Sequence, residues 1–250
     1  MKINLLEIPV YYINLDDQNE KRIRTENLLS DLGFKNVERF SAIRHDAGRI
    51  IGCARSHYEI LKTKKPPFII LEDDCDLNRK FEHELELPDN SDALYLGISH
   101  WGRYLNHSGP YVHYEKYNDK LLRVYNMLAT HAICYLSDTY ADICKRISYH
   151  CGYEVENHLD IGFAEVHKLY NVYSFDEPIF RQYEWSVVTT GKLSDIAIDK
   201  KSSEKLFNKI LKEDQNYYKI NHTFKSPLKP LLEMRDLNGI PGYFLPIKLI

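Results

Sequence analysis

The hydrophobic positions of this chain form short runs separated by longer amphipathic segments. The short runs are rich in β-branched and aromatic residues, and they predict strands at residues 8–14, 37–42, 68–71 and 93–98. Residues 17–33 and 54–62 carry a helical period, with Asp17 and Glu20 placed as a capping box and Gly33 as a stop. Strands that alternate with helices predict an α/β fold with a mainly parallel sheet.

The helical period disappears between residues 99 and 126, where aromatic residues are interleaved with glycines. Asn118-Asp119 lies between two β-type runs, at 111–117 and 121–127, which predicts a hairpin acting as a flap. Further along, Ser137 or Asp138 is placed to cap a helix. The remaining pattern predicts strands at 130–136, 172–175 and 179–182, helices at 138–150 and from about 156, and a C-terminal helix and tail at 201–250.

Composition narrows the class of protein. The chain has 250 residues, 33 basic and 36 acidic, and a net charge of -3 without a basic tract, so nucleic acid is not an expected partner. Its five cysteines are scattered, odd in number and lack a CxxC pair, so the sequence indicates neither a zinc site nor a disulfide framework. We find no secretory signal and no apolar window of membrane-spanning length, and we therefore expect a cytoplasmic protein.

The strand predicted at 68–71 ends abruptly in acidic residues. Glu72, Asp73, Asp74 and Asp76 follow one another within five positions, and their mutual repulsion is tolerable if a cation lies among them. The plain alternative is a solvated acidic turn. Position favours the first interpretation, because ligands in open α/β sheets bind beyond the carboxyl ends of strands.

Aromatic residues in the predicted flap suggest a second surface. Trp101 and Tyr104 are candidates for contact with a carbohydrate acceptor, since sugars offer apolar patches of C–H bonds to aromatic faces. The alternative is that these rings pack the flap onto the sheet.

Several blocks of the chain, in order over roughly the first 196 residues, resemble glycosyltransferase family 25, the group of lipopolysaccharide and collagen galactosyltransferases and their viral relatives. The blocks are Tyr12-Ile13-Asn14-Leu15-Asp16 with Lys21-Arg22, Phe40-Ser41-Ala42, Gly52-Cys53-Ala54-Arg55-Ser56-His57, Leu71-Glu72-Asp73-Asp74, Thr130-His131-Ala132-Ile133-Cys134-Tyr135-Leu136-Ser137, Asp160, Pro178-Ile179-Phe180-Arg181-Gln182 and Ser194-Asp195-Ile196. Two positions depart from the family pattern: Asp17 replaces its usual arginine, and Asp76 is an additional acid.

The resemblance implies a GT-A type fold, a Rossmann-like mixed sheet flanked by helices. Residues 1–200 would form the transferase domain, with a donor half at about 1–98, an acceptor half at about 99–200 and 201–250 as an extension. It also implies transfer of a hexose, galactose or glucose, from a nucleotide-diphosphate sugar such as a UDP-sugar to a glycan or protein hydroxyl, with Mn²⁺ or Mg²⁺ as cofactor. Inversion is the expected stereochemistry, although some related transferases retain configuration.

Roles follow for the residues in the matching blocks. Asp74 is the leading metal ligand, with Glu72 or Asp76 completing the site. Asp160 is the candidate catalytic base, supported by Glu156 one helical turn away. His131 is a candidate metal ligand or acceptor contact, although a lone histidine is more often structural. The candidate donor-binding residues are Asn14, Leu15, Arg22 with Lys21 beside it, Ser56, His57, Asp73 and Gln182.

Two other classes of protein remain open. One is a non-catalytic transferase-like module that binds sugars or a partner. The other is a metal-dependent phosphohydrolase that uses the same acidic strand end as a nucleophile or metal site. Retention of Glu72, Asp73, Asp74 and Asp160 favours an enzyme over the first, and the ordered blocks favour a transferase over the second.

Overall fold

The computed structural model describes residues 1–104, 107–154, 157–184 and 189–199. The predicted C-terminal helix and tail at 201–250 and the candidate residue Glu156 lie outside the described residues. The first third of the chain forms β1 (Lys2–Asn4), a 3₁₀ turn (Leu5–Glu7), β2 (Val10–Asn14), α1 (Asn19–Asp31), β3 (Val37–Ser41), α2 (Arg49–Thr63) and β4 (Phe68–Glu72).

The middle of the chain is dominated by strands. It contains β5 (Cys75–Leu77), β6 (Glu84–Glu86), β7 (Ala93–Tyr95), β8 (Gly102–Tyr104), β9 (His107–Gly109), β10 (His113–Lys116), β11 (Leu121–Asn126) and β12 (Ala132–Tyr135). The last described part contains α3 (Asp138–Tyr149), a π-helical turn (His150–Glu154), α4 (Leu159–Val166), a 3₁₀ turn (His167–Leu169), β13 (Val172–Phe175), β14 (Phe180–Gln182), a 3₁₀ turn (Leu193–Asp195) and β15 (Ile198–Asp199).

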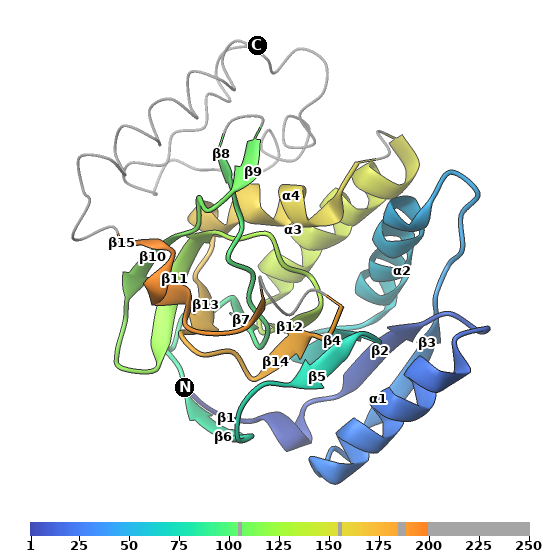
Figure 1. Ribbon diagram of the computed structural model, residues 1–250, viewed down its shortest axis with the longest axis horizontal. Helices are drawn as coiled ribbons and strands as arrows, with labels where there is room; N and C mark the ends of the chain where they lie inside the picture. The colour runs from blue at the N-terminus through green and yellow to red at the C-terminus, as the bar shows by residue number, and fades with distance from the viewer. Residues whose placement is uncertain (105–106, 155–156, 185–188, 200–250) are drawn as a thin grey trace.

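A nine-stranded mixed sheet forms the centre of the molecule, in the order β15-β10-β11-β13-β7-β12-β4-β2-β3 (Figure 1). The pairs β2–β3, β2–β4, β7–β13 and β10–β15 are parallel, and the pairs β4–β12, β7–β12, β11–β13 and β10–β11 are antiparallel. The α/β class and the mixed sheet flanked by helices are therefore confirmed, whereas the expectation of a mainly parallel sheet is wrong. Strands from both predicted halves of the domain share this sheet.

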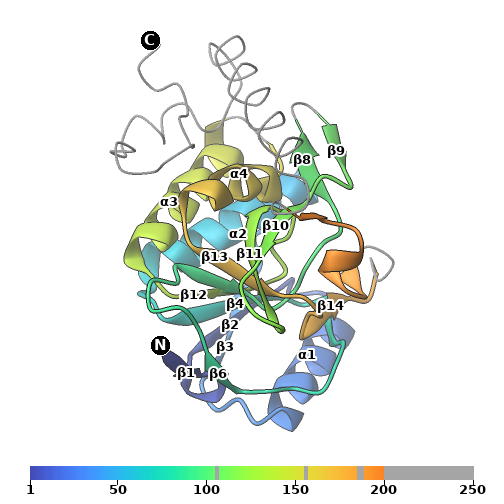
Figure 2. The ribbon, with the colours of Figure 1, turned by 90° about the vertical axis from the view of Figure 1, so that its left-hand side faces the viewer.

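Helices cover both faces of the sheet, with α2, α3 and α4 on one face and α1 on the other (Figure 2). The alternation of side chains along β4 explains this arrangement. Phe68 and Ile70 join the core under α2, α3 and α4, whereas Ile69 and Leu71 join the core that includes Leu29 of α1. Both faces of β4 are apolar because both are covered.

The predicted hairpin around Asn118-Asp119 forms as expected, from β10 and β11. It is not a free flap, because β11 also pairs with β13 and so belongs to the main sheet. A second, smaller hairpin pairs β8 with β9 and stands apart from the main sheet. Figure 1 shows this hairpin beside α4.

The border between β2 and β4 is the point where the connections of the sheet change direction. The connection from β2 to β3 runs through α1 on one face, and the connection from β3 to β4 runs through α2 on the other. Ile13 lies opposite Glu72 in the register, so both strands end at the same edge. Open α/β sheets bind ligands at such an edge, and this is where the acidic residues lie.

Helix starts differ in part from the sequence prediction. Ser137 caps α3 as expected, accepting the Tyr140 N–H at 3.2 Å. The capping box predicted for α1 is wrong, because its N-cap is Gln18 without a side-chain cap bond, and Asp17 pairs with Arg44 instead. An arginine that arrives from a distant loop can outcompete a local backbone N–H for a carboxylate.

Candidate functional site at the carboxyl edge of the sheet

Glu72 is the last residue of β4 and points toward α2. Its Oε1 accepts the Thr130 hydroxyl at 2.7 Å and lies 3.3 Å from Nε2 of the buried His57. Burial by itself would raise the pKa of Glu72, but the hydrogen bonds from His57 and Thr130 more than offset it, so this pKa lies below its usual range. Glu72 is therefore a carboxylate at neutral pH, held in a fixed orientation.

Asp74 follows β4 by two residues and is held by an amide rather than by a cationic side chain. Its Oδ2 accepts Nε2 of Gln182 at 2.9 Å, whereas its buried Oδ1 has no hydrogen-bond partner among the described residues. Burial, together with the negative charge of Glu72, raises the pKa of Asp74 to about 7. A buried carboxylate oxygen without a donor is costly unless a cation or ligand meets it.

Asp73 connects the ends of β4 and β2. Its Oδ2 accepts Nδ2 of Asn14 at 2.7 Å, and Arg39 on β3 donates to both the side-chain and the main-chain oxygen of Asn14. Burial raises the pKa of Asp73, while the bond from Asn14 and the charge of Lys21 act in the opposite direction. The structure therefore brings the two predicted donor-binding residues together and shows them bonded to each other.

Asp76 has different neighbours from Asp74. Its carboxylate pairs with Arg24 of α1 at 3.0 Å and with Arg181 of β14 at 3.3 Å. Its charge is thus neutralised by two guanidinium groups. Of the two residues proposed to complete the metal site with Asp74, Glu72 is the one that the structure couples electrostatically to it.

Asp160 lies in the first turn of α4, and its Oδ1 accepts the Ile161 N–H at 2.9 Å. Burial raises the pKa of Asp160; the positive charge of His158 and the hydrogen bond from the Ile161 N–H lower it, and the negative charge of Glu72 raises it. The charges of Glu72, Asp160 and Asp74 also act together on the Cys53 thiol, so we treat these three acids as one acidic group. Its predicted partner Glu156 lies outside the described residues.

His131 is buried beside the acidic group and packs against backbone. A Cβ on Gly97 would lie 2.0 Å from its Nε2, so this glycine is required for the close approach. Burial lowers the pKa of His131 to about 4, against the opposing effect of Glu72. The side chain is therefore a neutral imidazole enclosed in the core.

The other predicted donor-binding residues already have structural partners. Ser56 is fully buried and bonds the carbonyl of Gly52 and the N–H of Ile43. Arg22 is exposed and pairs with Glu26 on its own helix. Leu15 supplies a carbonyl for the turn before α1, and Lys21 pairs with Glu184.

Trp101 directly precedes β8 and is 47% exposed, and its assignment as an acceptor contact stays a prediction. The backbone of Tyr104 ends β8, and its side chain is outside the described part of the structure.

Three residues that organise this edge were not chosen as candidate site residues from the sequence: Cys53, Thr130 and Arg39. Cys53 lies one helical turn before His57, and its Sγ is 3.9 Å from Oε1 of Glu72. The spacing of four residues between a cysteine and a histidine was a readable signal in a helix. The contacts of Thr130 and Arg39 carried no such signal, because they depend on which strands become neighbours.

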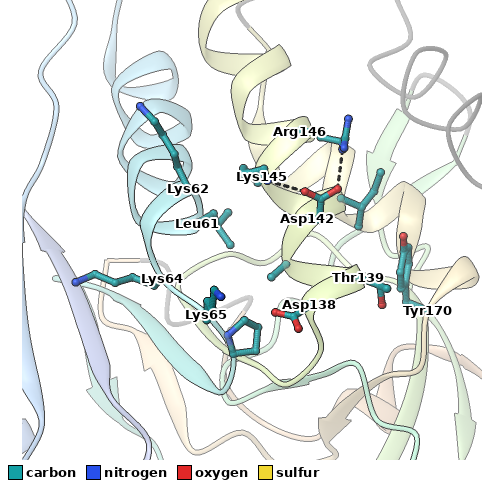
Figure 3. A pocket seen from close by; sticks show the side chains of 13 residues that line it. Leu61, Lys62, Lys64, Lys65, Asp138, Thr139, Asp142, Lys145, Arg146 and Tyr170 are labelled. Atoms are coloured by element: carbon teal, nitrogen blue, oxygen red, sulfur yellow. Dashed lines mark hydrogen bonds and ion pairs between the residues drawn. The ribbon is translucent and has the colours of Figure 1, made fainter.

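A groove of about 660 Å³ lies at the opposite end of the sheet, between the end of α2 and the start of α3. Figure 3 shows lysines and acidic residues around it, with Asp142 held by Lys145 and Arg146. Most of these charges are paired: Lys62 bonds Glu59, and Lys64 bonds Glu38. The groove therefore has room for a ligand, but most of the charged side chains that line it already form ion pairs within the protein.

No family model, curated protein or solved structure matches the chain. In the part of the chain that the structure describes, none of the helices combines the length and apolar character needed to cross a membrane.

Proposed function

We propose that this protein is a metal-dependent glycosyltransferase that uses a nucleotide-diphosphate sugar. One observation carries the proposal: Asp74, with a buried and unpartnered Oδ1, lies in an acidic group with Glu72 and Asp160 at the carboxyl edge of β4. An all-oxygen donor set of carboxylates suits Mn²⁺ or Mg²⁺, which bind through a few carboxylates and the phosphates of a substrate.

The surroundings of the acidic group fit a nucleotide donor of the kind implied by the resemblance to glycosyltransferase family 25. The group lies where the connections of the sheet change direction, which favours a nucleotide along the ends of β2 and β4. Asn14 and Asp73 are fixed to each other there, and in the proposal they present polar atoms to the ribose or the sugar. The finer assignments, a GT-A fold and a UDP-linked hexose, are part of the same proposal.

The residues have distinct roles in the proposed reaction. Asp74 and Glu72 would hold the cation, which supplies neutralisation of the charge on the departing diphosphate. Gln182 fixes Oδ2 of Asp74 and so leaves Oδ1 facing the cation position. Asp160 accepts the proton of the attacking hydroxyl, because a carboxylate whose pKa is raised is a better base near neutral pH. This role belongs to an inverting transfer.

Thermal unfolding with ligands tests the proposal directly. The protein is heated with Mn²⁺ and a panel of UDP- and GDP-sugars, each with and without the metal. A nucleotide at about 100 times its dissociation constant adds about 2.7 kcal/mol to stability, so the unfolding temperature should rise only when metal and nucleotide are both present. No rise with any nucleotide would contradict the proposal.

A second assay separates the two enzyme classes. The chain is incubated with Mn²⁺ and either nucleotide-sugars or a simple phosphate monoester, and released products are measured. We expect slow hydrolysis of one nucleotide-sugar and none of the monoester. The opposite result would favour a phosphohydrolase built on the same acidic group.

A further inference from the structure

Three side chains with different donor atoms converge behind the acidic group. Cys53 and His57 lie four residues apart on α2, so they project from the same face of the helix. Glu72 reaches them from the end of β4, which runs beside α2 (Figure 1). Sγ of Cys53, a ring nitrogen of His57 and a carboxylate oxygen of Glu72 all lie within 4.8 Å of one another.

The distances match those between ligands of a tetrahedral metal. Bond lengths of about 2.3 Å to sulfur and about 2.0–2.2 Å to nitrogen and oxygen place neighbouring ligand atoms roughly 3.3–3.6 Å apart. Nε2 of His57 lies 3.3 Å from Oε1 of Glu72, and Sγ of Cys53 lies 3.9 Å from the same oxygen. The third pair, Sγ of Cys53 and a ring nitrogen of His57, lies within 4.8 Å, so a metal would draw the sulfur inward.

The donor set selects a different metal from the one expected at Asp74. Thiolate and imidazole are ligands of Zn²⁺ and Co²⁺, whereas Mn²⁺ and Mg²⁺ prefer oxygen. The thiolate and the carboxylate together balance a divalent charge. Burial and the negative charges of Glu72, Asp160 and Asp74 hold the pKa of the Cys53 thiol well above its ordinary value. The thiol would give up its proton on binding a cation, which the same negative charges attract.

A purely structural role explains these contacts less well. The contact between Cys53 and Glu72, at 3.9 Å, is long for a hydrogen bond and leaves the sulfur weakly engaged. Thr130 holds the shared carboxylate oxygen at 2.7 Å, which is the kind of outer contact that orients a metal ligand. The Glu72 side chain is 21% exposed, whereas that of His57 is fully buried, so solvent reaches the carboxylate side of the cluster.

We propose that Cys53, His57 and Glu72 form a three-ligand site for a thiophilic divalent metal, with Zn²⁺ as its occupant and the fourth position open to water or substrate oxygen. The site goes beyond the proposed function, because its ligands bind the metal whether or not the chain transfers sugars. Glu72 is shared with the acidic group, so the two cation positions would be adjacent and chemically distinct.

Cobalt spectroscopy tests the site without relying on activity. The metal-free protein is titrated with Co²⁺ alone, and we expect a thiolate-to-cobalt charge-transfer band together with intense visible bands typical of tetrahedral cobalt. Zn²⁺ should abolish these bands at one equivalent, and Mn²⁺ should leave them unchanged. Absence of a charge-transfer band in the wild-type protein would overturn the proposal.

Matched variants assign the band to its ligands. Cys53→Ser should lose the charge-transfer band, whereas Cys134→Ser should keep it, because Cys134 belongs to the core on the opposite face of the sheet. Thr130→Val, which keeps the shape but removes the hydroxyl, should keep the band and weaken Co²⁺ affinity about 10-fold. A band that survives in folded Cys53→Ser would also overturn the proposal.

A measurement on the wild-type chain covers the case in which Cys53→Ser does not fold. Alkylation of each cysteine is followed by mass spectrometry, with and without one equivalent of Zn²⁺. Protection of Cys53 is expected, and equal labelling in both samples would contradict the site. Asp74→Ala separates the two proposals, because it should lose nucleotide-sugar turnover and keep the cobalt band. Unchanged turnover would contradict the proposed transferase, and loss of the band would contradict the proposed metal site.

Discussion

Charged side chains gather at both ends of the central sheet, but they are neutralised in different ways. In the groove between α2 and α3, Asp142 is held by Lys145 and Arg146, and the pairs are partly open to water. At the carboxyl edge of β4, Glu72 and Asp74 are close together, and Oδ1 of Asp74 is left without a partner. Exposed pairs contribute about 0–1 kcal/mol each, whereas an unpaired buried charge is costly. Unsatisfied charge therefore marks the candidate site better than hollow volume does.

The largest expected effect is on turnover at the acidic edge. Asp74→Asn keeps the shape of the side chain and removes its charge, so metal-dependent turnover of a nucleotide-sugar should fall by about 100-fold or more, equivalent to about 2.7 kcal/mol. Asp142→Asn in the groove is the matched control and should leave turnover at the wild-type level. Equal losses in both variants would remove the distinction between the two ends.

The packing around His131, at the acidic edge, should tolerate an added methyl group less well than the groove does. Gly97→Ala places a Cβ against the ring of the buried His131, and overpacking of this kind costs about 1–3 kcal/mol. The urea midpoint should fall with an unchanged slope. Adding His131→Ala to Gly97→Ala removes the clashing ring, so the two losses should be clearly less than additive; strict additivity would argue against this contact.

Acid should weaken the half of the core beneath the groove. Burial lowers the pKa of His167 to about 3, with the nearby charge of Arg123 acting in the same direction, and its Nε2 bonds the Tyr95 hydroxyl at 2.9 Å. The unfolded chain takes up the proton near pH 6.5 and the folded chain does not. Stability is therefore fully present above pH 6.5 and falls as the pH drops toward 3, by up to about 1.4 kcal/mol per pH unit from this residue.

Urea unfolding of His167→Gln at several pH values checks this expectation. Glutamine keeps a donor for Tyr95 but does not titrate, so the slope of stability against pH should become shallower than in the wild-type protein. His113, whose pKa burial lowers to about 4, should still contribute. An unchanged slope in the variant would show that His167 is not the group responsible.

The smallest effect is expected in the groove itself. Lys65 is exposed, and Lys145 forms a pair at the surface. Replacing both by alanine should change stability by no more than about 0.5 kcal/mol and leave nucleotide-sugar turnover unaffected. A fall in turnover of about tenfold would show that the groove contributes to the reaction and would break the comparison.

The strands and helices could largely be predicted from the sequence, because apolar runs such as 68–71 and the amphipathic period of α3 indicate local burial. Strand order could not be predicted in the same way. β12 lies between β4 and β7 and runs antiparallel to both, and no local pattern distinguishes such a strand from a parallel one.

The candidate site also has features that local sequence predicts and features that depend on tertiary contacts. The acidic strand end and the position of Asp160 were predicted, and the structure brings Glu72, Asp74 and Asp160 into one electrostatic group. The pairing of Asp76 with Arg24 and Arg181 could not be foreseen, because the arginines come from a helix and a strand far apart in the chain. Local patterns show where charge is concentrated, and only tertiary structure shows which charge remains unpaired.

The central place of β12 also affects how the chain is made. As synthesis proceeds, β2, β3 and β4 can pair once residue 72 is available, but one edge of β4 then waits for residues 132–135. Until that time the nascent sheet presents an apolar strand with unsatisfied N–H and C=O groups, which is the kind of edge that recruits other chains. The segment that leads into β12 also brings Thr130 to Glu72, so the interval of greatest aggregation risk ends as the acidic edge is assembled.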